Sequence, residues 1–234
     1  MRALATAALD LLFPAVCPLC AARLGSGRRD PVCGACWRSF ARLTPPLCAA
    51  CGVPVSSEAI ARCAACRDIA MPFDYVRAAA SYGGAVRDAV HALKFGGRRS
   101  LARPLGDLIV EQCADVLAAP DALVPVPLAR GRERERGFNQ AALLAERLGE
   151  RLSLRVRARW LVRLRATAAQ SDLSAAERRA NVENAFAAAP AVAGRDVDLV
   201  DDVITTGATV GECARALRAS GARCIGVVAV ARVL

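Results

Sequence analysis

The sequence predicts an α/β protein, with a mainly parallel sheet flanked by helices and a small metal-binding module in front of it. Two observations carry this prediction. Strand-like and helix-like stretches alternate from residue 74 onward, and eight of the eleven cysteines lie between Cys17 and Cys66. The length of 234 residues suits one domain and a small module. We therefore expect a cysteine-rich module over residues 1–70 and the sheet domain over residues 71–234.

Composition narrows the classes of protein that this chain can represent. Hydrophobic residues make up 55%, which is typical of a globular chain, but aromatic residues make up only 4%. Surfaces that bind bases by stacking are therefore scarce. The net charge of +10 permits phosphate, nucleic-acid or acidic-lipid partners without choosing among them. Lys94 is the only lysine, so guanidinium groups supply nearly all of the positive charge.

The first residues, MRALATAALDLLFPAVC, predict a short amphipathic helix. The apolar run is too short to span a bilayer, and it lacks the features of a cleaved signal peptide. We expect no transmembrane segment and a cytoplasmic protein, with a peripheral position at the inner membrane as the alternative.

Four C-x-x-C pairs follow one another at nearly regular spacing. Each pair can present two thiolates to one metal ion, and two pairs complete a tetrahedral four-cysteine site of the zinc-ribbon type. Disulfides would need an oxidising compartment, and redox motifs rarely occur in fours. We expect two structural Zn²⁺ sites rather than iron sites. Consecutive and interleaved pairing both fit the spacing of the ligands, Cys17, Cys20, Cys33, Cys36, Cys48, Cys51, Cys63 and Cys66.

The remaining residues predict strands that alternate with helices, which is typical of a parallel sheet. A polar stretch over residues 165–174 predicts a loop. The expected strands are 74–82, 122–126, 154–164, 197–200 and 224–230, and the expected helices are 85–94, 101–117, 137–152, 175–181 and 209–220.

A strand, a polar turn and a helix follow one another from Val197 to Val210. The strand would carry Asp201 and Asp202 to the carboxyl edge of the sheet, where α/β proteins bind ligands. The loop that follows offers hydroxyl groups, a glycine turn and a helix N-terminus, which together suit a phosphate group. Carboxylates accept hydrogen bonds from a diol, so this turn predicts a ribose 5-phosphate site made of Asp201, Asp202, Thr205, Thr206, Gly207, Ala208 and Thr209.

The run VDLVDDVITTGAT resembles the signature of the type I phosphoribosyltransferases. The resemblance implies binding of 5-phosphoribosyl-1-pyrophosphate (PRPP) together with Mg²⁺. It places Asp201 and Asp202, the implied catalytic residues, on the ribose hydroxyls, and residues 205–209 on the 5-phosphate. Purine-salvage members carry an acid where this chain has Thr205, so purine transfer is not expected. The mobile loop of the orotate enzymes uses lysine and histidine, of which this chain has one each.

The whole chain resembles the ComF family, a double zinc ribbon fused to a type I phosphoribosyltransferase domain. The matching stretches are DLLFP, ALKFGGRRSLA, VPVPLARGRERERGFNQ and R-x-T-x-x-Q-x-x-L. Lys94, beside two glycines, suits pyrophosphate, or it is a plain cation at a helix C-terminus. Arg136 follows a strand end and suits the same ligand, whereas the neighbouring arginines also fit a solvated, self-paired helix. By resemblance, Arg165 and Gln170 lie on a loop that closes over the substrate.

Three functions are compatible with these features. The first is a phosphoribosyltransferase that binds PRPP and acts in DNA uptake during natural competence, with competence proteins at the inner membrane as partners. The second is a non-catalytic competence factor that binds single-stranded DNA, with Trp37 and Phe40 as the main stacking candidates of the ribbon. The third is an adaptor in gluconate use or iron–sulfur maturation, a role proposed for another member of the family.

Overall fold

The computed structural model describes residues 15–25, 30–117, 120–165 and 175–234. The amphipathic helix expected at the start of the chain lies outside these ranges, as do Gln170 and nearly all of the expected loop 165–174. Among the described residues, no helix is long and apolar enough to cross a membrane.

A four-stranded parallel sheet forms the centre of the fold, in the order β1-β6-β5-β2. Its strands are β1 (Tyr75–Ser81), β2 (Ala122–Pro125), β5 (Asp196–Ile204) and β6 (Cys224–Arg232). The two inner strands, β5 and β6, are buried along most of their length because helices cover both faces. The parallel sheet predicted from the sequence is therefore confirmed.

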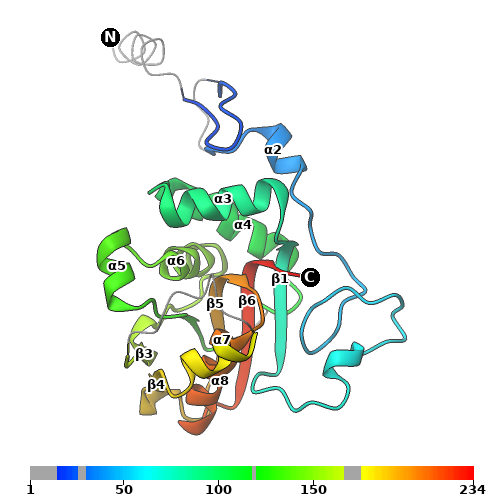
Figure 1. Cartoon of the computed structure of the whole chain (residues 1–234), viewed down its shortest axis with the longest axis vertical. Helices are drawn as coiled ribbons and strands as arrows, with labels where there is room; N and C mark the ends of the chain where they lie inside the picture. Colours follow the sequence, from blue (N-terminus) through cyan, green and yellow to red (C-terminus); the bar gives the residue numbers. More distant parts are fainter. Residues whose placement is uncertain (1–14, 26–29, 118–119, 166–174) are drawn as a thin grey trace.

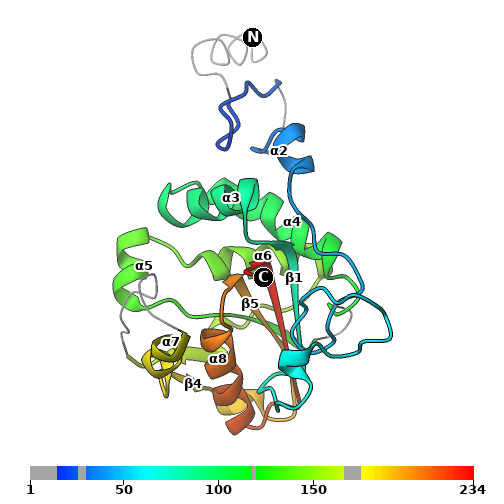
Figure 2. The ribbon, with the colours of Figure 1, turned by 45° about the vertical axis from the view of Figure 1, so that its right-hand side comes forward.

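Helices cover the two faces of this sheet (Figures 1 and 2). One face carries α3 (Gly84–Phe95), α4 (Ala102–Gln112) and α6 (Gln140–Leu152), whose apolar side chains form one core with Val200 and Val228. The opposite face carries α7 (Ala175–Val182) and α8 (Ala208–Ala219), and α8 buries Cys213 and Leu217 there. Three layers result, and the carboxyl ends of the strands meet at one edge.

A small antiparallel hairpin lies beside the main sheet, formed by β3 (Leu161–Arg163) and β4 (Phe186–Ala188). The prediction of one strand over residues 154–164 is wrong, because this stretch changes partner along its length. Residues 155–157 first lie along β2, bonded at Leu123. A 3-10 turn over Ala158–Trp160 follows, and only then does the chain pair with β4.

Two further elements differ from the expected ones. The helix expected over residues 101–117 ends at Gln112, in α4. The basic stretch after β2 forms the short helix α5 (Arg130–Arg136), which ends at Gly137 with a left-handed φ of 76°. The stretch is thus helical, as one of the two alternatives expected, but Arg132 and Arg136 also line the cavity described below.

The second half of the cysteine module is docked on the free edge of β1. Residues 41–43 pair with β1 through hydrogen bonds from Leu43 N to Ala79 O (3.0 Å) and from Ser81 N to Ala41 O (2.9 Å). Gly52, with a φ of 71°, lies so close that an added Cβ would come within 2.4 Å of Val76 O. The second cysteine cluster therefore rests directly on the sheet that carries Asp201 and Asp202.

Gly52→Ala is expected to destabilise the zinc-loaded protein by roughly 2 kcal/mol or more, because the new methyl group meets backbone and the left-handed φ is strained. Thermal unfolding measures the effect. Gly25→Ala is the control, since nothing lies within 4 Å of its added Cβ. Equal melting temperatures for the two variants would contradict this docking.

Candidate functional site

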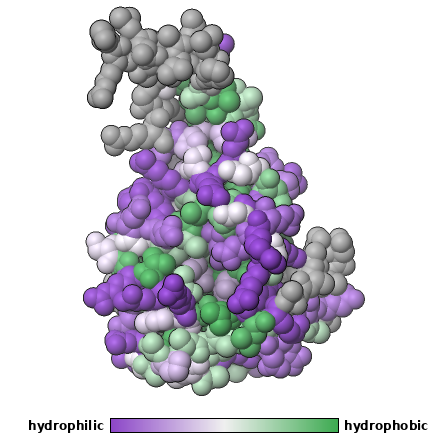
Figure 3. Space-filling model, turned by 90° about the vertical axis from the view of Figure 1, so that its left-hand side faces the viewer, coloured by the Kyte–Doolittle hydropathy of each residue, from purple (hydrophilic) through white to green (hydrophobic). Residues whose placement is uncertain are grey.

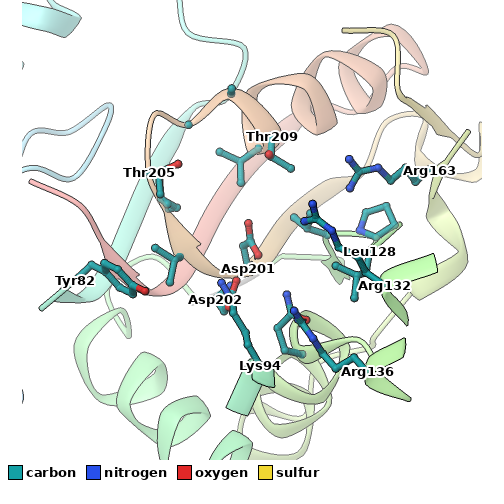
Figure 4. Close-up of a pocket in the computed structure, with 18 of the residues that line it drawn as sticks. Tyr82, Lys94, Leu128, Arg132, Arg136, Arg163, Asp201, Asp202, Thr205 and Thr209 are labelled. Atoms are coloured by element: carbon teal, nitrogen blue, oxygen red, sulfur yellow. Dashed lines mark hydrogen bonds and ion pairs between the residues drawn. The ribbon is translucent and has the colours of Figure 1, made fainter. Parts of the chain in front are cut away.

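A cavity of about 550 Å³ opens at the carboxyl edge of the main sheet. It lies where β1, β2 and β5 end, between α3, α5 and the start of α8 (Figure 4). Ligands of open α/β proteins bind at this edge. Its polar and charged lining consists of Tyr82, Lys94, Arg132, Glu135, Arg136, Gln140, Arg163, Asp201, Asp202, Thr205 and Thr209.

Asp201 and Asp202 belong to the second half of β5 rather than to the loop beyond it. They are 9% and 3% exposed. The Asp202 amide donates a hydrogen bond to Asp201 Oδ1 at 2.8 Å. Burial raises the pKa of the Asp201 carboxyl to about 6, although the Lys94 ammonium works against the rise. Both carboxylates face the cavity as little-hydrated acceptors, as a diol site requires (Figure 4).

Lys94 lies at the end of α3, and its Nζ is 2.5 Å from Asp202 Oδ2. Burial lowers the pKa of Lys94 to about 8, and Asp201 partly opposes this effect. The helix ends here because Gly96 caps it and Gly97 takes a φ of 61°. The only lysine of the chain is therefore the counterion of the acid pair.

The loop after β5 surrounds the mouth of the cavity with backbone groups. Gly207 takes a left-handed φ of 76° and is the N-cap of α8, and the first residues of this helix line the cavity. The Thr206 hydroxyl accepts a hydrogen bond from the Ala208 amide at 3.4 Å, which makes it part of the turn. Thr205 and Thr209 line the cavity itself, whereas Thr206 does not.

Guanidinium groups from α5 form the opposite wall. Arg132 and Arg136 line the cavity, and Arg136 donates a hydrogen bond to Gln140 at the start of α6. The Arg136 guanidinium also lies 5.2 Å from the ring centroid of the exposed Phe95. Figure 3 views the molecule from the side of α5 and shows mostly hydrophilic residues, with small apolar patches between them.

The structure places the other expected residues as follows. Arg165 donates to the Glu183 carbonyl and does not line the cavity, and Gln170 lies outside the described residues. Tyr82 and Arg163 line the cavity but were not among the expected residues. The position of Tyr82 at the end of β1 was a usable signal, because the carboxyl ends of parallel strands meet at one edge. The sequence held no comparable signal for Arg163, because the strand that carries it was wrongly predicted.

The cysteines form two clusters with consecutive pairing, and within each cluster the four sulfurs lie within 4.8 Å of one another. Cys20 Sγ and Cys33 Sγ are 3.6 Å apart, and Cys51 Sγ and Cys63 Sγ are 3.7 Å apart. A tetrahedral ion with zinc–sulfur bonds of about 2.3 Å requires sulfurs about 3.8 Å apart. The clusters therefore fit two four-cysteine zinc sites, Cys17/Cys20/Cys33/Cys36 and Cys48/Cys51/Cys63/Cys66.

Backbone amides favour the thiolate form of at least one sulfur in each cluster. The Cys63 amide donates to Cys48 Sγ at 3.3 Å, and the Cys33 amide donates to Cys17 Sγ at 3.4 Å. Burial opposes ionisation of the Cys48 thiol, but amide donors that include Cys51 and Cys63 lower its pKa to about 6. An ionised sulfur is the form that ligates zinc.

Comparison with known proteins assigns both parts of the chain. Residues 8–70 match the family described as a double zinc ribbon domain, and residues 135–234 match the phosphoribosyl transferase domain. The chain is 35% identical to DNA utilization protein YhgH of Escherichia coli O6:H1, over 96% of this chain and 100% of that protein. It is 32% identical to competence protein F of Haemophilus influenzae, over 87% and 91% of the two chains.

Competence protein ComFC of Bacillus subtilis is 31% identical over 82% of this chain and 80% of its own. Among solved structures, glutamine PRPP amidotransferase of Bacillus subtilis aligns with 55% of this chain and 26% of its own, at 22% identity and a TM-score of 0.40. That structural similarity is too low to establish a shared fold.

Fold, cysteine clusters and family matches together define a double zinc ribbon joined to a phosphoribosyltransferase domain. The relatives extend over nearly the full length of the chain. The chain belongs to the ComF family.

Cys48→Ser is expected to lower the zinc content from two ions to one per chain, because serine is a poor zinc ligand. Elemental analysis measures the content. Cys20→Ser should also remove one ion, because the first cluster then keeps only three of its four sulfur ligands. Cys224→Ser, outside both clusters, should keep both ions. Unchanged zinc in Cys48→Ser would contradict the site.

Proposed function

We propose that this chain binds PRPP in the cavity at the carboxyl edge of the sheet and transfers its ribose 5-phosphate to an acceptor. The observation that supports this is the meeting of three groups in one cavity: the acid pair of β5, the loop over residues 205–209, and the cations Lys94, Arg132 and Arg136. These groups match the diol, the phosphate and the pyrophosphate of one molecule. In this proposal the chain has two domains, the double zinc ribbon over residues 1–70 and the phosphoribosyltransferase domain over residues 71–234.

The described residues divide the work of the reaction as follows. Asp201 and Asp202 accept hydrogen bonds from the ribose hydroxyls and orient C1 toward the guanidinium wall. Amides of the loop at Gly207 and hydroxyls of Thr205 and Thr209 hold the 5-phosphate. As the bond from C1 to pyrophosphate breaks, Arg132 and Arg136 stabilise the charge on the leaving group, while the acids stabilise the positive ribose.

Mg²⁺ enters this proposal only as an ion bound to the pyrophosphate of the donor. Among the described residues, only the two cysteine clusters bring three or more metal-ligating side chains together. Asp202 is already paired with Lys94. The acid pair thus does not fit a resident divalent ion, and no step of the proposal depends on one.

The biological setting that we propose is DNA uptake or use in competence, with the protein in the cytoplasm. Its support is the names of the relatives, DNA utilization protein, competence protein F and competence protein ComFC. A purely single-strand-binding role has weaker support, because Phe40 is 3% exposed and Trp37 packs against it at 5.3 Å. Such a role needs open aromatic faces.

Gly207→Ala is expected to weaken binding of ribose 5-phosphate roughly tenfold, because alanine strains the left-handed turn that aims the loop amides. Isothermal titration measures the affinity. The matched control is Gly194→Ala, which has a similar φ of 71°, equally free space and a position away from the cavity. Equal affinities in both variants, or no binding of ribose 5-phosphate to the unmodified protein, would refute the proposed site.

The affinity for ribose 5-phosphate should fall as the pH drops below about 6, because protonated Asp201 loses acceptor capacity for the diol. Burial raises the pKa of Asp201, so the carboxylate form that binds is present above this value and is lost below it. The phosphate also titrates near pH 6, roughly alike in every variant. Titrations of Asp201→Asn should therefore show a flatter profile, and parallel profiles would count against this role.

A further inference from the structure

The position of Lys94 suggests a role beyond that of a simple pyrophosphate ligand, given the proposed function. Its ammonium lies 2.5 Å from Asp202 Oδ2, and the two side chains are 22% and 4% exposed. The same ammonium is attracted by Asp201 and repelled by Arg136 and Arg132. Lys94 is therefore next to the acid pair and close to the arginines, and in Figure 4 its side chain reaches Asp202 with Arg136 beside it.

This intermediate position matches a junction in the proposed ligand. In PRPP the pyrophosphate is attached at C1, next to the hydroxyl group at C2. A ligand whose diol contacts the acids and whose pyrophosphate contacts the arginines must place that junction close to Lys94. A cation at this point neutralises the buried carboxylate and also faces the oxygen that leaves from C1.

Lys94 is held at this point by a rigid part of the fold. It belongs to the last turn of α3, and the neighbouring Val90 and Leu93 are fully buried in the core. The next residue, Phe95, lies beneath the Arg136 guanidinium at 5.2 Å. The ammonium is thus part of the framework of the site and does not need to be recruited from solvent.

We propose that Lys94 is a built-in cation that takes the place of a divalent ion at the acid pair of this protein. It neutralises Asp202 in the free protein, and it stabilises the pyrophosphate oxygen at C1 when the donor is bound. Ribose 5-phosphate binding then needs no divalent metal. This proposal rests on the proposed function and adds that Lys94 is the cation next to C1 of the ribose.

The test is isothermal titration of the full-length, zinc-loaded protein with ribose 5-phosphate and with PRPP, each without added divalent ions and with Mg²⁺. A weak chelator that leaves the two bound zinc ions in place keeps the first condition free of Mg²⁺. The unmodified protein should bind ribose 5-phosphate equally in both conditions. Lys94→Met should bind PRPP about 30-fold more weakly without Mg²⁺, and Mg²⁺ should restore part of the loss.

Arg87→Met is the matched control, because it removes an exposed cation from the same helix, whose described ion pair is with the adjacent Asp88. It should bind both ligands as the unmodified protein does. Lys94→Met leaves Asp202 buried without its partner, so a double variant, Lys94→Met with Asp202→Asn, separates folding from binding. The double variant should fold, bind PRPP weakly and gain nothing from Mg²⁺.

Two results would overturn the role of Lys94: a strict requirement of the unmodified protein for Mg²⁺ to bind ribose 5-phosphate, or PRPP affinity in Lys94→Met equal to that of Arg87→Met. Failure of the proposed function gives a different result, since the unmodified protein would then bind neither ligand in either condition.

Discussion

The burial of two adjacent carboxylates at the end of the central strand governs the rest of this site. Charges removed from water are costly unless a partner compensates them. Asp202 has Lys94 as its partner, whereas Asp201 keeps a raised pKa. The two acids of one motif thus differ in environment: Asp202 is paired with a lysine, and burial raises the pKa of Asp201 to about 6. The arginines of α5 then complete a cavity with an acidic and a basic side.

Zinc supplies the stability that the cysteine module cannot obtain from its own core. The second cluster gathers a small buried set, with Ala50 beside its cysteines and Val53 and Val55 packed against it. Hydrogen bonds join it to the sheet: Arg77 donates to the carbonyls of Cys48 and Ala49, and Arg232 donates to Cys51 O. The second metal site and the cavity therefore both adjoin β1, although they lie at different parts of the sheet.

The sequence predicted most of the parallel sheet and its helices, because buried strands and amphipathic helices have distinct periodicities. It also predicted the order of strand, turn and helix around residues 197–210, since the acids, the glycine and the threonines lie within one short segment. It failed over residues 154–164, where alternation marked extended backbone correctly but could not show that the pairing partner changes from β2 to β4. It also missed Tyr82 and Arg163, which reach the cavity from other segments.

By itself, the sequence determined the local chemistry: eight thiols in four C-x-x-C pairs, two adjacent acids before a turn of threonines and glycine, and a chain of the α/β class. The tertiary structure decided the relations between distant segments. It decided that consecutive C-x-x-C pairs share one cluster, and it placed the second cluster on β1. It also paired Lys94 with Asp202, which is 108 residues further along the chain. The physical reason is that spacing along the chain specifies contacts only within one element. Contacts between elements depend on how the helices and strands pack, and they alone bring a lysine of α3 to the acids of β5.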